Sequence, residues 1–89
     1  MDEAADLNWR CYILECVDGT LYTGITNDLD KRLAAHNAGT ASKYTRSRLP
    51  VRVIFFEAHP DRASASRREN EIKRMPRAGK LRLATSQST

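Results

Sequence analysis

The chain has 89 residues, of which 40% are apolar and 29% charged, a balance typical of one small globular domain. A chain of this length leaves room for one small sheet and two or three helices but excludes a doubly wound cofactor-binding fold. The formal net charge is +4, with basic residues concentrated in residues 43–52 and 62–82. This clustering suits a polyanion such as nucleic acid, or a charge that serves only solubility.

Residues 1–8 carry three acidic residues and no basic one, so they exclude a secretory signal and are predicted to be a flexible acidic segment. No apolar run reaches the ~20 residues of a membrane span. We therefore expect a cytoplasmic protein with no membrane partner. Cys11 and Cys16 lie in one predicted strand, too far apart to form a disulfide within it, and are expected to be small buried side chains.

The first half of the chain predicts a hairpin followed by a helix. Residues 9–17 are rich in β-forming side chains, Asp18-Gly19 is a hairpin signal, and residues 20–26 form the return strand. Gly24 weakens this strand unless another group must approach its backbone closely. Asn27-Asp28 then offers a helix N-cap for residues 29–37, which stop before Gly39.

The second half predicts a third strand and a second helix. Residues 40–50 are polar, basic and without a period, so we expect a loop, followed by a strand over residues 51–57. Asp61 is the expected cap of a helix that ends or kinks at Pro76. A short last helix over residues 80–84 precedes a frayed tail, residues 85–89.

The predicted fold is α+β, a three-stranded antiparallel sheet flanked by two or three helices in the order β-β-α-β-α-(α), with a single domain over residues 9–84. Four sets of residues are candidates for chemistry. Tyr12 and Tyr22 lie near one another on the hairpin, either as a cross-strand packing pair or as phenols that position a substrate. Arg32 and His36, four residues apart, share one helix face, which is either solvated or able to bind phosphate and move a proton.

Glu69 shares a predicted inward helix face with Ala65, Ile72 and Met75, where a carboxylate must be paired or hold a metal. Its basic neighbours Arg67, Arg68 and Lys73 offer the simpler explanation. In the polar loop, three basic residues bracket an aromatic one, which suits a grip on phosphate and base or an ordinary basic surface. These four loop residues are Lys43, Tyr44, Arg46 and Arg48.

Taken together, these positions resemble a GIY-YIG nuclease domain, close to the small stand-alone bacterial members and similar to the N-terminal domain of one component of excinuclease ABC. The two signature triplets correspond to Arg10-Cys11-Tyr12 and Tyr22-Thr23-Gly24. Further matches are Asn27-Asp28-Leu29, Arg32, His36, the segment Lys43-Tyr44-Thr45, Pro50 and Glu69. The resemblance spans about residues 9–83.

The resemblance implies a metal-dependent endonuclease that hydrolyses DNA phosphodiester bonds, with a role in DNA repair or recombination. Glu69 would hold one divalent cation, Mg²⁺ or Mn²⁺, Tyr12 would be the general base for the attacking water, and Tyr22 would orient that water or the phosphate. Arg32 would neutralise charge on the phosphoryl oxygens and His36 would assist proton transfer. Substrate binding would fall to Gly24, Lys43, Tyr44, Arg46 and Arg48.

The expected partner is DNA, branched or single-stranded, with a transient homodimer or a larger repair complex as further expectations. The alternative is a module that binds DNA or RNA with weak or vestigial catalysis, and the third hypothesis is a protein-interaction adaptor. Cleavage, binding without cleavage, and no nucleic-acid affinity at low salt distinguish the three hypotheses.

Overall fold

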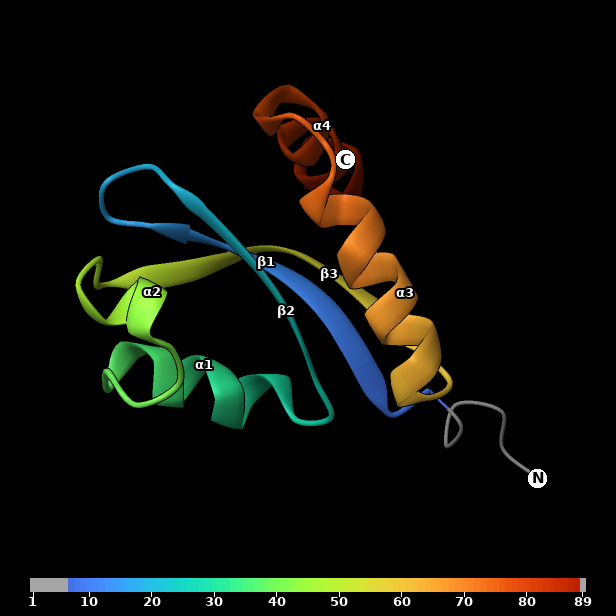
Figure 1. Ribbon diagram of the computed structural model, residues 1–89, viewed down its shortest axis with the longest axis horizontal. Helices are drawn as coiled ribbons and strands as arrows, with labels where there is room; N and C mark the ends of the chain where they lie inside the picture. The colour runs from blue at the N-terminus through green and yellow to red at the C-terminus, as the bar shows by residue number, and fades with distance from the viewer. Residues whose placement is uncertain (1–6, 89) are drawn as a thin grey trace.

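A computed structural model describes residues 7–88 of the chain. Three strands form one antiparallel sheet in the order β2-β1-β3, which confirms the predicted α+β fold. Figure 1 shows the sheet between α1 and α2 on one side and α3 and α4 on the other. In chain order the elements are β1 (Trp9–Cys16), β2 (Leu21–Thr26), α1 (Leu29–Asn37), α2 (Lys43–Arg46), β3 (Val51–His59), α3 (Arg62–Lys73) and α4 (Arg77–Ser88).

The hairpin between β1 and β2 turns at Asp18-Gly19, as the sequence predicts. Gly19 has a φ of 84°, a left-handed conformation that glycine adopts without strain, and its amide donates to the Cys16 carbonyl at 2.9 Å. The turn sets the register of the sheet, in which Tyr12 lies opposite Gly24 and Leu14 lies opposite Tyr22.

The central strand β1 is buried on both faces, because helices cover each side of the sheet. Cys11 and Ile13 pack with Phe55 and with Ile72 of α3. Alternate residues of β1, including Tyr12, face the other way and pack against α1. Cys11 and Cys16 are both buried, free and on opposite faces, as expected.

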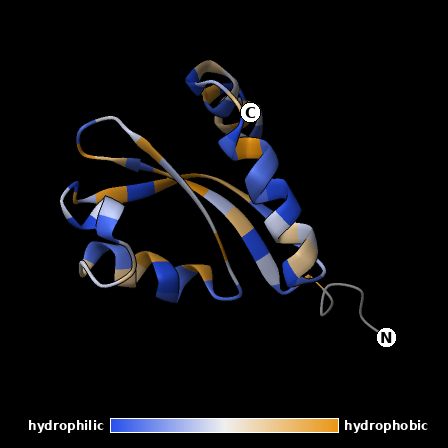
Figure 2. Ribbon diagram, viewed as in Figure 1, coloured by the Kyte–Doolittle hydropathy of each residue, from blue (hydrophilic) through white to orange (hydrophobic). Residues whose placement is uncertain are grey.

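Both predicted helix caps are present. The Asp28 side chain accepts from the Lys31 amide at 3.1 Å at the start of α1, and the Asp61 side chain accepts from the Ser64 amide at 2.8 Å at the start of α3. Figure 2 shows that α3 is mostly hydrophilic, with apolar residues concentrated in the strands. Among the described residues, no helix is long and apolar enough to cross a membrane.

Two predictions about the polar segments need correction. The expected loop of residues 40–50 contains the one-turn helix α2, because the Ser42 hydroxyl caps it by accepting from the Tyr44 amide at 3.1 Å. Four residues are too few to produce a helical period, so the pattern did not reveal it. The strand β3 also extends beyond residue 57, since Trp9 of β1 pairs with His59.

The last helix is longer than residues 80–84, and α4 includes residues 85–88 that were expected to fray. Gln87 explains the difference, because its side-chain oxygen accepts from the Phe56 amide at 3.0 Å and its side-chain nitrogen donates to the Phe56 carbonyl. The amide side chain thus satisfies the backbone of Phe56 at the open edge of β3. Leu83 and Ala84 pack against the core beneath. Of the predicted acidic segment, residues 1–6 lie outside the described part of the chain.

Candidate active site

The hydroxyl of Tyr12 lies directly over Gly24, its partner on β2. A Cβ at position 24 would lie 2.6 Å from the Tyr12 hydroxyl oxygen and 3.2 Å from the Tyr22 ring, well inside van der Waals contact. The close approach expected at this glycine is therefore made by the protein's own tyrosine. Because glycine has no side chain, the Tyr12 hydroxyl can occupy the space above position 24.

Tyr12 begins a buried chain of hydrogen bonds that runs into α1 and α2. The Tyr12 hydroxyl lies 2.9 Å from His36 Nε2, and His36 Nδ1 lies 2.9 Å from the Thr45 hydroxyl. Thr45 donates its one hydroxyl proton to the Ser42 carbonyl at 3.4 Å, so it accepts from His36 Nδ1–H. Nε2 is then the acceptor, and Tyr12 donates to it. His36 and Thr45 are each 0% exposed, so His36 does not lie on a solvated helix face.

The electrostatics of this chain keep both groups neutral. Burial raises the pKa of Tyr12 to about 12; nearby Arg32 opposes the shift, while the charges of Tyr22 and Glu69 add to it. Burial, and then the charge of Arg32, lowers the pKa of His36. A neutral imidazole with a free Nε2 lone pair is in position to take the Tyr12 proton.

Tyr22 and Tyr44 extend the site toward the surface. The two rings stack with centroids 6.0 Å apart, and the Arg48 guanidinium lies 4.0 Å over the Tyr44 ring. Arg48 also pairs with Asp18 at 3.2 Å, so it holds the aromatic column against the hairpin turn. Tyr44 is 38% exposed. Tyr22 and Arg48 thus pack against the Tyr44 ring, and the column places an aromatic side chain beside a positive charge at the surface.

The structure separates the basic candidates of the polar segment. Lys43 and Arg46 are exposed on α2, whereas Arg48 is half-buried and engaged by Asp18 and the Tyr44 carbonyl. Arg32 is half-buried on α1 and acts on the Tyr12 hydroxyl. Arg32 therefore lies at the phenols, while Lys43 and Arg46 offer mobile charge beside Tyr44.

Glu69 approaches the phenols from the opposite side of the sheet. Its side chain is 18% exposed and pairs with Lys73 at 3.3 Å, the pairing that the sequence offers as the simpler explanation. Its helix α3 packs against β1 and the edge strand β2. Burial is the main cause of the raised pKa of both Cys11 and Tyr12, and the charge of Glu69 adds a smaller effect to each. No direct contact joins Glu69 to Tyr12 within the described residues.

The donor set around Glu69 fits a weakly held hard cation. Within residues 7–88, no group of three or more His, Cys, Asp or Glu side chains is arranged to hold a metal. A single half-buried carboxylate is the ligand set of a Mg²⁺ or Mn²⁺ ion that takes its other ligands from water and substrate phosphate. Glu69 would supply that carboxylate in place of its pairing with Lys73.

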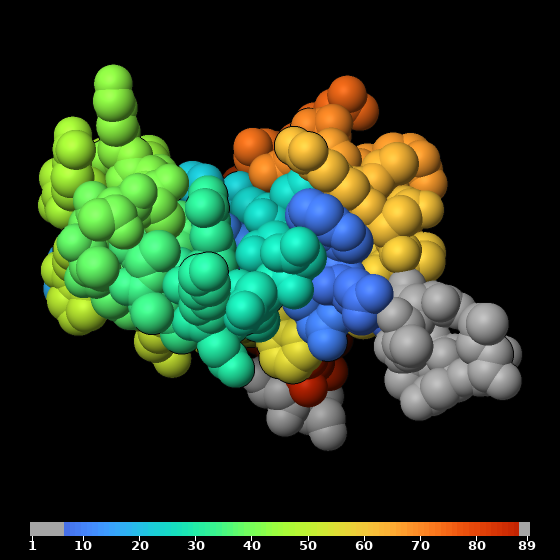
Figure 3. Space-filling view, turned by 90° about the horizontal axis from the view of Figure 1, so that it is seen from below, coloured from blue at the N-terminus to red at the C-terminus, as the bar shows by residue number. Residues whose placement is uncertain are grey.

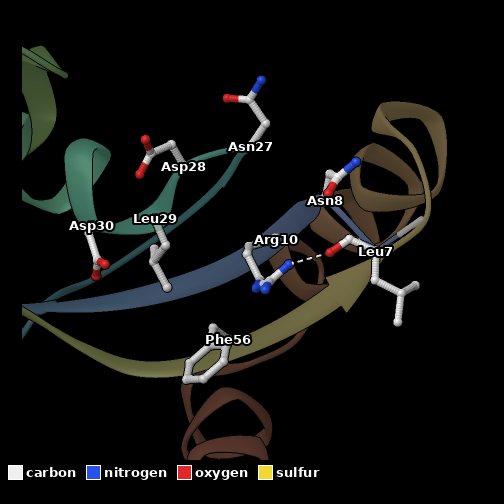
Figure 4. Close-up of a pocket in the computed structure, with 8 residues that line it drawn as sticks. All are labelled: Leu7, Asn8, Arg10, Asn27, Asp28, Leu29, Asp30 and Phe56. Carbon is white, nitrogen blue, oxygen red and sulfur yellow. Dashed lines mark hydrogen bonds between the residues drawn. The ribbon is translucent and has the colours of Figure 1, made fainter. Parts of the chain in front are cut away.

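Two cavities lie near the N-terminal end of β1. One cavity of about 510 Å³ is lined by residues that include Arg10, Asp28, Asp30 and Phe56 (Figure 4). Within its lining, Arg10 donates to the Leu7 carbonyl at 2.7 Å. The other, of about 310 Å³, contains Arg32 and so adjoins the phenols. The larger cavity carries two carboxylates and lacks the candidate catalytic residues.

The chain belongs to the GIY-YIG family: the model of the GIY-YIG catalytic domain matches residues 8–82. This family places it among the GIY-YIG nucleases. Within it, the chain is 52% identical over 73 residues to a UPF0213 protein of Xanthomonas axonopodis pv. citri, covering 82% of this chain and 72% of the relative. It is 49% identical over 77 residues to a UPF0213 protein of Clostridium perfringens, covering 86% and 83% of the two chains.

Two solved structures share the fold. The solution NMR structure of a UPF0213 protein from Bacillus halodurans has a TM-score of 0.56 at 43% identity, covering 86% of this chain and 82% of that one. The solution NMR structure of an E. faecalis protein has a TM-score of 0.58 at 34% identity, covering 90% of this chain and 86% of that one. These relatives confirm the small stand-alone group within the family.

Sequence reasoning missed the part that Thr45 plays in the site. Thr45 was recognised only as part of a matching segment, yet it fixes the tautomer of His36. Asn37 was missed as well: its side chain exchanges two hydrogen bonds with the Val51 backbone, at 3.1 and 2.8 Å, and so ties α1 to β3. The only signal was position, because each lies within ten residues of His36 and is polar.

Proposed function

We propose that this protein is a metal-dependent endonuclease that hydrolyses DNA phosphodiester bonds at the site formed by Tyr12, Tyr22, Arg32, His36 and Glu69. The observation that carries the proposal is the buried Tyr12–His36–Thr45 chain next to Tyr22 and Arg32. Burial of three polar side chains is tolerated because each is hydrogen-bonded. These bonds hold the Tyr12 hydroxyl against His36 Nε2, an arrangement suited to proton transfer.

The residues divide the reaction between proton transfer and charge neutralisation. As water attacks phosphorus, the bond from phosphorus to the leaving oxygen breaks, and that oxygen takes a proton from solvent water. The proton of the attacking water passes to the Tyr12 oxygen while the Tyr12 proton passes to His36 Nε2, leaving an imidazolium that Thr45 orients. Arg32 offsets the charge on the phosphoryl oxygens. Tyr22, half-buried beside Tyr12 with ring centroids 6.5 Å apart, orients the water or the phosphate. When bound at Glu69, a divalent cation supplies polarisation of the phosphate and stabilisation of the leaving oxygen.

Substrate contacts lie around this centre. Lys43 and Arg46 offer positive charges to the phosphate backbone of DNA, and Tyr44 lies exposed beside them. Gly24 contributes indirectly, by admitting the Tyr12 hydroxyl. Because one 89-residue chain carries one such site, cutting both strands requires two successive events or a transient homodimer.

The test is a cleavage assay on plasmid, branched and single-stranded DNA with Mg²⁺ or Mn²⁺, and with a chelator. We expect Glu69→Gln to lower the rate by about 10²–10³-fold, as removal of a transition-state charge stabiliser does. Glu71→Gln is the matched control, because Glu71 lies on the same helix but is 62% exposed. Equal cleavage by wild type and Glu69→Gln would sink the mechanism.

One observation favours the second candidate, a DNA- or RNA-binding module with weak catalysis. Tyr12 is 1% exposed and its pKa is raised to about 12, so as the structure stands it is a poor base that water hardly reaches. This candidate predicts salt-dependent binding, with log affinity falling by about 0.7–0.9 per phosphate contact against log salt. Binding without cleavage on every substrate and metal would favour it over the nuclease.

A further inference from the structure

The cavity of about 310 Å³ beside Arg32 has the composition of an anion site. Its lining residues include two arginines and no carboxylate: Trp9, Ile25, Thr26, Asn27, Arg32 and Arg62. Figure 3 shows the start of β1 at the surface between the segment that leads into α1 and the start of α3. Three segments distant in sequence therefore build this one hollow.

Arg32 brings a positive charge to the cavity, because it is one of the lining residues. Its Nε is buried and has no hydrogen-bond partner among the described residues. A guanidinium in the wall of a cavity attracts an anion and can pair with phosphate oxygens. Because Arg32 also acts on the Tyr12 hydroxyl, the cavity adjoins the proposed catalytic centre.

Trp9 and Arg62 supply the other half of the hollow. Trp9 is half-buried, and the Arg62 guanidinium carbon lies 6.0 Å from the centre of its indole ring. Arg62 is exposed and makes no ion pair within the described residues, which leaves its charge available to a ligand. Asn27, also exposed, stands on a turn ordered by Thr26, whose hydroxyl accepts from the Asp28 amide at 3.0 Å.

The neighbouring cavity of about 510 Å³ differs from this one in its charged residues. The 510 Å³ hollow carries Asp28 and Asp30, which repel phosphate, and its one basic residue, Arg10, donates to the Leu7 and Trp9 carbonyls. The 310 Å³ hollow combines two guanidiniums with an aromatic face instead. Its volume is at the small end of ligand pockets, which span about 300–1,000 Å³, and this suits a single nucleotide.

We propose that this cavity, the Trp9–Arg62 cavity, binds one unpaired nucleotide of the DNA strand next to the scissile phosphate. Arg32 and Arg62 hold its backbone phosphate, the indole of Trp9 stacks on its base, and Asn27 hydrogen-bonds to its polar edge. Only a base that is not inside a duplex offers its face to a side chain. Resting on the proposed nuclease function, this inference narrows the substrate to DNA with a single-stranded segment at the cut.

The experiment uses the tryptophan itself, because Trp9 is the one tryptophan of the chain. The full chain, with a chelator present to prevent cleavage, is titrated with a short thymidine oligonucleotide while Trp9 fluorescence is recorded. We expect saturable quenching, weakened about fivefold to tenfold by Arg62→Ala, which removes a charge-assisted contact. Arg67→Ala removes the same charge from an exposed position of α3 and should change the affinity less than twofold.

Any of these results would overturn the proposal: no quenching up to millimolar oligonucleotide, equal weakening by Arg62→Ala and Arg67→Ala, or equal affinity for a blunt duplex. Free thymidine monophosphate that binds as tightly as the oligonucleotide would assign the cavity to a free nucleotide and also overturn it. A failure of the nuclease proposal alone would give a different result. Arg62-dependent quenching by a protein that never cleaves would keep the cavity and reject the nuclease.

Discussion

The two faces of the sheet share one central strand but are built by opposite rules. On the α3 face, Cys11 and Ile13 of β1 meet Phe55 and Ile72 in an apolar core. On the α1 face, Tyr12 of the same strand meets His36 and, through it, Thr45, all three buried and hydrogen-bonded. The alternation of side chains along a strand allows both arrangements within adjacent residues.

This difference indicates that the two faces contribute differently to the protein. The apolar face contributes stability through burial of apolar surface, a non-directional effect, and a polar group buried there without a partner would be unfavourable. The polar face fixes orientation, because each hydrogen bond specifies a distance and a direction. Glu69 belongs to the helix of the apolar face, so a site that combines it with Tyr12 draws residues from both faces of the sheet.

The largest effect on stability is expected on the apolar face. Ile72→Ala removes a fully buried side chain and should lower the free energy of unfolding by about 2–5 kcal/mol. Urea unfolding measures it. Val17→Ala, at a position 64% exposed, is the control and should stay within about 0.5 kcal/mol. A loss below about 1 kcal/mol at Ile72 would show that this face does not carry the stability.

On the polar face, Gly24→Ala should cost about 1–3 kcal/mol, because the new methyl group lies within 2.6 Å of the Tyr12 hydroxyl. The phenol must move off His36 Nε2, so cleavage should fall as well. Gly79→Ala in α4 is the matched control, since its Cβ meets nothing closer than 3.4 Å and the change favours the helix. Equal stability of the two variants would contradict the close approach.

Thr45→Val tests the hydrogen-bonded chain with little change of shape. Loss of the hydroxyl leaves His36 Nδ1 buried without an acceptor and should cost about 1–2 kcal/mol in urea unfolding. Thr23→Val is the control, since Thr23 is 4% exposed on β2 and lies outside the chain of hydrogen bonds. If both substitutions cost the same, Thr45 is only a packing residue.

The fold was predictable because its signals are local. Asp18-Gly19 predicts the hairpin, and Asp28 and Asp61 predict the starts of two helices. Pro76 separates the helices α3 and α4. The helix α2 was not predictable because its four residues are too few to show a helical period. The extension of α4 was not predictable because it depends on a tertiary contact: Gln87 hydrogen-bonds to Phe56 of β3, 31 residues away.

The residues of the candidate site could be predicted from the sequence, but the hydrogen bonds between them could not. The resemblance singled out Tyr12 and His36, and the spacing of the hairpin placed the two phenols together. That the Tyr12 hydroxyl bonds to His36 follows from how α1 packs on the sheet, which no local pattern encodes. The same holds for Trp9 and Arg62, which meet because β1 and α3 begin at the same end of the sheet (Figure 1).

The smallest expected effect is a pH dependence that distinguishes the polar face from the apolar one. Since burial lowers the pKa of His36 in the folded protein, the unfolded chain binds more protons once the pH falls below the ordinary histidine value of about 6.5. The free energy of unfolding should therefore fall between about pH 7.5 and 5.5, measured by urea unfolding at each pH. In His36→Asn this fall should be shallower, because the titrating imidazole is gone, whereas Ile72→Ala lowers stability at both pH values alike. An undiminished fall in His36→Asn would mean that the pH dependence arises elsewhere and that His36 is not held neutral by its burial.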